Sequence, residues 1–232
     1  MKGKKQFRFA AIGQFCNVFE YPENMAEQWA HFFGNRNDII LELACGKGEY
    51  TLALAQNNTD KNFVGVDIKG NRMYVGAKKA LDNDIKNVAF LRTQIQRIEE
   101  YFAPKSVAGI WITFPDPFLR ESKAKNRLTH SRFLKYYQAI LKDNAVIHLK
   151  TDSKPLFDFT MEMISLHKCT VVERIDNVYA HGEPEFPLSV KTFYEQQHLA
   201  NHRTIQYICF RLPKEPIVVP PKKKNNEEET TF

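Results

Sequence analysis

Apolar and polar positions alternate along the middle of the chain in an order that predicts strands and helices by turns. Short apolar runs rich in β-branched and aromatic residues indicate strands, which we place at 38–44, 62–67, 87–91, 107–114 and 144–150. Segments with apolar residues three or four positions apart indicate helices, which we place at 48–57, 70–82, 95–102, 130–142 and 154–167. Two later apolar segments, 169–175 and 204–211, indicate an antiparallel hairpin that closes the sheet. This order predicts an α/β fold with a mostly parallel sheet.

The two ends of the chain lack this regular pattern. Residues 1–23 mix aromatic and basic side chains and are interpreted as an N-terminal arm, after which Asn24 is expected to cap a helix. From residue 213 onward the chain is rich in Pro, Lys and Glu, which predicts a flexible tail. We therefore expect one domain over 24–212, within which the loop 177–189 is long enough to suggest a function.

Composition narrows the class of protein only a little. The chain has 232 residues, 43% of them hydrophobic, and a net charge of +6, which permits a polyanionic partner without establishing one. Its apolar runs are strand-sized, and no apolar segment follows the basic N-terminus, so we expect neither a membrane span nor a signal peptide. The four cysteines form no C-x-x-C pair, which favours reduced thiols in a cytoplasmic protein.

An acidic turn follows the apolar run 107–114. In Phe114-Pro115-Asp116-Pro117, two prolines restrict the backbone on both sides of Asp116. This places one carboxylate at the carboxyl end of a strand, where open α/β sheets bind their ligands. A plain proline-rich turn is the structural alternative, and a second motif makes it the weaker one.

That second motif is a glycine turn between the strand 38–44 and the helix 48–57. Gly46 and Gly48 let a ligand approach the backbone, and the following helix N-terminus favours negative charge. Asp67 ends the next strand about 20 residues further on, the position of a carboxylate that binds ribose hydroxyls. The alternative for Asp67 is a turn or cap residue.

Several motifs, in this order, resemble those of the tRNA (guanine-N7-)-methyltransferases of the TrmB type, over about 38–211. They are Leu41-Glu42-Leu43-Ala44-Cys45-Gly46-Lys47-Gly48, Gly65-Val66-Asp67-Ile68, Phe114-Pro115-Asp116-Pro117-Phe118 with its basic loop, Thr151-Asp152, and Thr192-Phe193-Tyr194-Glu195. Three positions depart from the family: Phe118 replaces a Trp, Asn126 interrupts the basic run, and Gln94 stands where the family has an acidic residue near adenine.

The resemblance implies a Rossmann-like class I methyltransferase fold: a mostly parallel seven-stranded sheet, helices on both faces and an antiparallel final strand. It also implies S-adenosylmethionine as cofactor and a guanine at position 46 of the tRNA variable loop as methyl acceptor. Glu42 would pair with the ammonium group of the cofactor's methionine portion, and Asp67 would accept from its ribose hydroxyls. Gly46 and Gly48 would contact the cofactor through their backbone, and Gln94 would hydrogen-bond its adenine.

Methyl transfer to guanine needs no proton transfer, because N7 already carries a lone pair. Catalysis can therefore depend on holding N7 in line with the bond between sulfur and the methyl group. Asp116 would stabilise the positive charge that develops on the base, with a contact to the cofactor amine as its alternative role. Asp152 would accept from guanine N1–H and the exocyclic amine, or cap the next helix. Tyr194 would stack on the base or pack in the core. The remaining expected tRNA-binding residues are Arg120, Lys123, Lys125, Arg127, Thr192 and Glu195, the first four with a solvated loop as alternative.

Two other functions remain open from the sequence. An amino-methyltransferase acting on another nucleic-acid or protein nitrogen would carry an Asn/Asp-Pro-Pro-aromatic turn, and here Asp116 lies between the prolines. A non-catalytic RNA-binding module would not need both cofactor acids. We expect no metal site, because His198 and His202 share a helical face with Glu195 but lack a further motif-supported ligand. The oligomeric state is expected to be monomer or homodimer.

Overall fold

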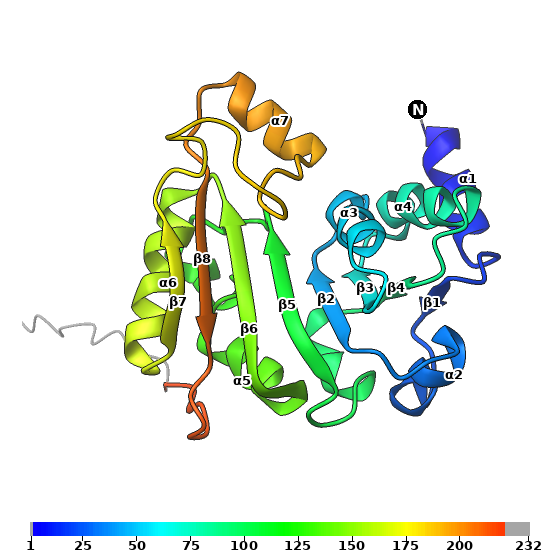
Figure 1. Ribbon diagram of the computed structural model, residues 1–232, viewed down its shortest axis with the longest axis horizontal. Helices are drawn as coiled ribbons and strands as arrows, with labels where there is room; N and C mark the ends of the chain where they lie inside the picture. Colours follow the sequence, from blue (N-terminus) through cyan, green and yellow to red (C-terminus); the bar gives the residue numbers. More distant parts are fainter. Residues whose placement is uncertain (1, 221–232) are drawn as a thin grey trace, which may run out of the picture.

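A mixed eight-stranded sheet forms the centre of the computed structural model, which describes residues 2–220 (Figure 1). The strand order is β1-β4-β3-β2-β5-β6-β8-β7. The strands are β1 (Val18–Glu20), β2 (Ile39–Leu43), β3 (Asn62–Asp67), β4 (Val88–Arg92), β5 (Val107–Thr113), β6 (Leu141–Thr151), β7 (Thr170–Ile175) and β8 (Gln206–Arg211). Neighbours from β1 to β6 pair in parallel, whereas β8 is antiparallel to both β6 and β7. The expected parallel sheet with an antiparallel final strand is confirmed, with one strand more than expected.

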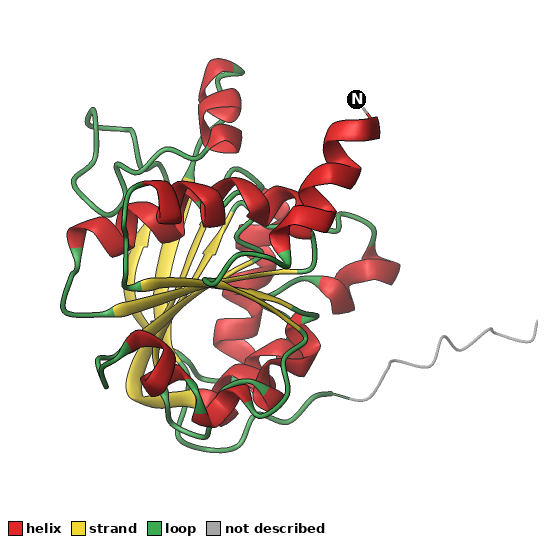
Figure 2. Ribbon diagram, turned by 90° about the vertical axis from the view of Figure 1, so that its right-hand side faces the viewer, coloured by secondary structure: helices red, strands yellow, loops and turns green. Residues whose placement is uncertain are grey.

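Helices cover both faces of this sheet (Figure 2). The α-helices are α1 (Lys2–Ile12), α2 (Trp29–Phe33), α3 (Glu49–Asn57), α4 (Gly70–Asp82), α5 (Ser131–Ile140), α6 (Lys154–Leu166) and α7 (Phe193–Ala200), and the 3₁₀ helices are η1 (Met25–Glu27), η2 (Ile95–Glu100) and η3 (Glu121–Asn126). Apolar residues of α1, α3 and α4 form a core on one face, and those of α2, η2, α5 and α6 form a core on the other. Because both faces are covered, central strands such as β3 are buried along their whole length.

The extra strand comes from the expected N-terminal arm. Residues 2–12 form α1, which packs on α4, and β1 pairs with β4 at the edge of the sheet. Asn24 does not cap a helix with its side chain, because its backbone adopts φ 54° and its side chain makes no cap hydrogen bond. The arm is therefore part of the domain.

The beginning of the expected tail is also attached to the domain. The Gln138 side chain donates to the carbonyl oxygens of Pro213 and Glu215 (2.8 and 2.9 Å) and accepts from the amide of Ile217 at 2.9 Å. Ile217 is buried against the core. Lys222 to Lys224, together with the rest of 221–232, lie outside the described residues. Among the helices of residues 2–220, none is both long and apolar enough to cross a membrane.

Candidate active site

A cleft of about 1340 Å³ opens at the carboxyl ends of the parallel strands. Figure 1 shows α7 above the ends of β5 and β6. Open α/β sheets bind ligands at this edge, where the helix connections diverge to opposite faces. Most of the expected site residues line the cleft: Glu42, Gly46, Asp67, Gln94, Asp116, Asp152 and Thr192. The fold thus brings together residues from six separate segments of the chain.

Asp67 and the glycine turn form one wall of the cleft. The amide of Gly46 donates to Asp67 Oδ2 at 2.9 Å, and the amide of Lys69 donates to Asp67 Oδ1 at 2.8 Å. These bonds fix a carboxylate that is only 7% exposed. Each carboxylate oxygen can accept a second hydrogen bond, so Asp67 retains capacity for a pair of ligand hydroxyls.

Gly48 does not line the cleft with Gly46. Its backbone is left-handed (φ 68°) as it caps α3, and a Cβ at this position would overlap the ring of Phe90. Gly48 therefore permits a turn and a close internal contact, which corrects the expectation that it allows a ligand to approach.

Glu42 lies at the base of the cleft, at the end of β2. Its Oε1 accepts from the Thr113 hydroxyl at 2.7 Å, and its Oε2 accepts from the amide and the hydroxyl of Thr51, the amide at 2.8 Å. Burial raises the pKa of Glu42 to about 7, against the lowering effect of these hydrogen bonds. A carboxyl group in this state gains from a cationic partner, which would favour its charged form.

The acidic turn after β5 forms the opposite wall. Phe114 has a left-handed backbone (φ 47°), and Asp116 is exposed at the cleft, with Oδ1 accepting from the Phe118 amide at 3.0 Å. The Phe114 ring stacks on His198 of α7, with centroids 5.7 Å apart. Asp116 is therefore presented to the cleft on a turn that its own side chain helps to close.

Arg127 does not share the position of the other basic residues in its loop. Arg120, Lys123 and Lys125 are exposed, whereas Arg127 is 5% exposed. Its guanidinium donates to the carbonyl oxygens of the turn 117–119 and lies 4.5 Å from the centroid of the Phe159 ring. The expectation that Arg127 binds the tRNA backbone is therefore corrected, because its donors are committed to the turn that follows Asp116.

Asp152 lies at the carboxyl end of β6 and faces the cleft. Its Oδ2 accepts from Arg203 Nη1 at 2.7 Å and lies 3.2 Å from His198 Nδ1. Ser153, not Asp152, caps α6, by accepting from the Leu156 amide. The alternative role of Asp152 as a helix cap is wrong.

Comparison with known proteins decides the family. Residues 36–208 match the family described as a putative methyltransferase. A tRNA (guanine-N(7)-)-methyltransferase of Bacteroides thetaiotaomicron is 44% identical, over 94% of this chain and 89% of that protein. The one of Cytophaga hutchinsonii is 37% identical, over 90% of this chain and 98% of that protein. The chain belongs to the tRNA (guanine-N(7)-)-methyltransferase family.

Solved structures show the same fold at low sequence identity. The match to the 16S rRNA methyltransferase KamB covers 83% of this chain and 96% of that one, with a TM-score of 0.63 and 13% identity. A 16S rRNA (adenine(1408)-N(1))-methyltransferase from Catenulisporales acidiphilia, solved with SAM, gives a TM-score of 0.59 at 13% identity. That match covers 84% of this chain and 96% of that one. The sheet of this tRNA (guanine-N(7)-)-methyltransferase family member therefore has the Rossmann-like class I methyltransferase fold.

The late Thr-x-x-Glu motif of this family member divides between the cleft and the interior. Thr192 lines the cleft and caps α7, accepting from the Glu195 amide at 3.2 Å. Tyr194 also lines the cleft, half-buried, with the Arg72 guanidinium 5.6 Å from its ring centroid, so the alternative core role is wrong. Glu195 is fully buried and does not line the cleft. The expectation that Glu195 binds the substrate is corrected: it pairs with Lys150 instead.

Two cleft residues were missed as site residues in the sequence. Arg203 was not singled out, and His198 was considered only as a metal ligand, yet both contact Asp152. The spacing of Tyr194 and His198 on one face of α7 was an available signal. No group of three or more His, Cys, Asp or Glu side chains within residues 2–220 is arranged to hold a metal ion.

Proposed function

We propose that this protein transfers the methyl group of S-adenosylmethionine to N7 of the guanine at position 46 of the tRNA variable loop, forming 7-methylguanosine. The observation that carries the proposal is that one cleft has Asp67 and Gly46 on one wall and Asp116 and Asp152 on the other. The chain's relatives are named for tRNA guanine-N(7) methylation, which supports the same substrate.

The residues of the first wall fit the cofactor. When bound, S-adenosylmethionine supplies a methyl group on a positively charged sulfur. Asp67 would accept from its ribose hydroxyls, and the Gly46 turn leaves room beside the backbone. Glu42 would take the ammonium group, which suits a buried carboxyl whose pKa is raised by lack of solvation. Gln94 is exposed at the cleft after β4 and would offer its amide to the adenine.

The residues of the second wall act on the base. Because N7 already has a lone pair, no side chain has to remove a proton, and catalysis rests on holding N7 in line with the carbon–sulfur bond. A nitrogen–carbon bond forms as that carbon–sulfur bond breaks, and positive charge moves from sulfur to the guanine. The Asp116 carboxylate, fixed by its turn, stabilises the charge that arrives on the base.

Asp152 would select guanine over adenine. Arg203 and His198 hold its Oδ2, which orients the carboxylate toward the cleft. A carboxylate accepts hydrogen bonds from the N1–H and the exocyclic amine of guanine, whereas adenine N1 offers no donor. Tyr194 would stack on the same base.

The exposed part of the basic loop would hold the tRNA backbone. Arg120, Lys123 and Lys125 follow the acidic turn directly and are exposed to solvent. Their positive charge lies beside the cleft, where phosphates on either side of the target nucleotide would pass. We also propose that the enzyme is cytoplasmic, acts as a monomer or homodimer and needs no metal ion, so that a chelator leaves turnover unchanged.

Nucleoside analysis tests the proposal directly. Purified protein is incubated with isotopically labelled S-adenosylmethionine and a tRNA transcript, and the digested RNA is analysed by mass spectrometry. We expect labelled 7-methylguanosine, and none from a transcript in which the guanine at position 46 is replaced by adenine. Labelled 6-methyladenosine would favour an amino-methyltransferase, and absence of cofactor binding would favour a non-catalytic RNA-binding module.

A further inference from the structure

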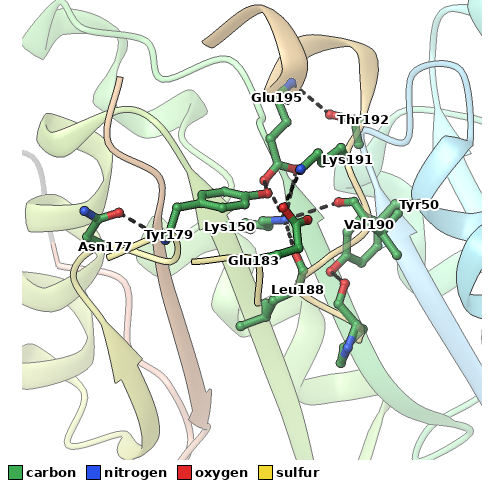
Figure 3. Close-up of polar contacts among 11 residues, drawn as sticks. Tyr50, Lys150, Asn177, Tyr179, Glu183, Leu188, Val190, Lys191, Thr192 and Glu195 are labelled. Carbon is green, nitrogen blue, oxygen red and sulfur yellow. Dashed lines mark hydrogen bonds and ion pairs between the residues drawn. The ribbon is translucent and has the colours of Figure 1, made fainter. Parts of the chain in front are cut away.

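A fully buried ion pair joins Glu195 of α7 to Lys150 of β6 (Figure 3), and neither residue lines the cleft. Lys150 Nζ lies 2.7 Å from Glu195 Oε1 and donates to Glu195 Oε2 at 2.9 Å, and neither side chain is exposed. Glu195 Oε1 also accepts from the Tyr179 hydroxyl at 2.7 Å. The ammonium donates further to the carbonyl oxygens of Leu188 and Val190, at 2.6 and 3.2 Å. These bonds join β6, α7 and the long loop before α7.

The two members of the pair stand next to residues of the proposed guanine site. Lys150 precedes Asp152 by two positions in the chain. Glu195 follows Tyr194 directly and lies one turn before His198, and both of those side chains line the cleft. His198 in turn contacts Asp152. The buried pair therefore links α7 to β6 beside the cleft residues that both elements carry.

Residues of the loop before α7 and the first residue of α7 also contact the glycine turn and the start of α3. The Phe193 amide donates to Glu49 Oε2 at 2.8 Å, and Lys47 Nζ lies 3.7 Å from the centroid of the Phe193 ring. The Tyr50 hydroxyl donates to the Pro187 carbonyl at 2.7 Å. Residues 187–195 thus contact α3 at one side and β6 at the other.

Packing alone does not require an ion pair at this place. Removing an ammonium and a carboxylate from water is costly, and a well-packed apolar pair is often as stable. Burial lowers the pKa of Lys150, an effect that the Glu195 carboxylate opposes. What charged hydrogen bonds add is direction, since each donor and acceptor fixes the position of its partner.

We propose that Lys150 and Glu195 are positioning residues, whose buried pair holds α7 so that Thr192, Tyr194 and His198 meet the target nucleotide in one fixed arrangement. This inference rests on the proposed function. The pair touches neither reacting group, so its loss acts through the placement of α7. Small displacements at a reacting centre reduce turnover by about tenfold to a hundredfold.

The test compares Lys150→Met, Glu195→Gln and the double variant with a matched control. Glu183→Gln is that control, because Glu183 forms an exposed ion pair with Lys191 in the same segment, at 2.6 Å. Four properties are measured in the full chain: the thermal midpoint, the affinity for S-adenosylhomocysteine by calorimetry, the steady-state kinetics with tRNA (kcat and KM), and amide hydrogen exchange over 188–200.

We expect the single variants to lower the thermal midpoint and speed exchange over 188–200, since each leaves a buried group without its partner. The double variant should regain most of the thermal midpoint yet keep a kcat for tRNA reduced about tenfold or more. Cofactor affinity should change by less than about threefold, because within residues 2–220 neither Asp67 nor Glu42 forms a hydrogen bond with the pair or with α7. The control should match the wild type in all four properties.

The outcomes separate this inference from the proposed function. Wild-type kcat in a folded double variant, or in a single variant with faster exchange over 188–200, overturns the positioning role. Equal loss in Glu183→Gln overturns it as well, because any change in the segment would then suffice. Failure of the wild-type protein to form 7-methylguanosine overturns the proposed function instead.

Discussion

The Arg127 guanidinium donates two hydrogen bonds to the carbonyl oxygen of Phe118, from Nε at 3.3 Å and from Nη2 at 3.2 Å. The amide of Phe118 donates to Asp116 Oδ1. The backbone of Phe118 is thereby held at its amide by Asp116 and at its carbonyl by Arg127. A buried cation thus supports the turn that presents the exposed carboxylate.

Arg127→Lys should reduce kcat about tenfold while leaving KM for tRNA nearly unchanged. A lysine keeps the charge but cannot donate in the planar fork that spans several carbonyls, so the turn loosens. Steady-state kinetics with tRNA measure both constants. Arg211→Lys is the matched control, since Arg211 donates to the Asn144 carbonyl and does not line the cleft. A raised KM with normal kcat would mean that Arg127 contacts tRNA after all.

Asp116→Asn should lower the rate of methyl transfer at least about tenfold, with an unchanged thermal midpoint. The asparagine oxygen still accepts from the Phe118 amide, so this variant removes charge and keeps the turn. Single-turnover formation of 7-methylguanosine measures the step. Asp116→Ala should lose at least as much, and a normal rate in either folded variant would rule out a catalytic role for this carboxylate.

Asp67→Ala should weaken S-adenosylmethionine binding by about 1–3 kcal/mol. The change removes the acceptor expected for the ribose hydroxyls and also frees the Gly46 amide that shapes the turn. Isothermal calorimetry gives the affinity. Asp60→Ala serves as the control, because it removes the same negative charge from an exposed position. Unchanged affinity would leave Asp67 a purely structural role.

Replacing Arg120, Lys123 and Lys125 together by Gln should weaken tRNA binding without altering cofactor affinity. Fewer counterions are then released, so the plot of log K against log salt should become shallower. A triple change of the exposed residues Lys86, Lys105 and Lys214 removes the same charge elsewhere and is the control. Equal losses in both triple variants would indicate a general charge effect and would sink the assignment of this loop.

Glu42 should make stability depend on pH. Its pKa rises from 4.5 to about 7 in the folded protein, so between these values the native state holds a proton that the unfolded chain has released. The free energy of unfolding should therefore fall as pH rises from about 4.5 to about 7, by about 3 kcal/mol from this group. Denaturant unfolding of the wild type and Glu42→Gln isolates the effect. Parallel pH profiles would contradict it.

Local patterns in the sequence were sufficient for most of the sheet and for one half of the site. Buried parallel strands are continuous apolar runs. Asp67 ends such a run and Asp116 and Asp152 each follow one, so their meeting at one edge follows from the order of the strands. The strand β1 has three residues, too few to show a pattern, and its pairing depends on β4 about 70 positions away.

The errors concern charged residues whose partners are distant in the chain or belong to the backbone. Glu195 pairs with Lys150, 45 positions away, and Arg127 donates to carbonyl groups that no sequence pattern identifies. Gly48 fits the expected glycine turn, but its neighbour is the ring of Phe90 from another strand. The motifs indicate the neighbourhood of these residues, whereas tertiary contacts decide which of them face the cleft.

The position of β8 between β6 and β7 affects the order in which the sheet can form during synthesis. The strand β7 leaves the ribosome before β8, yet in the sheet that residues 2–220 form, β7 pairs only with β8, which lies between it and β6. Until residue 211 has emerged, the nascent chain exposes the open edge of β6, the kind of edge that recruits stray strands. Completion of the sheet is therefore a late event in folding, and a chain truncated before residue 206 would lack the strand that joins β6 to β7.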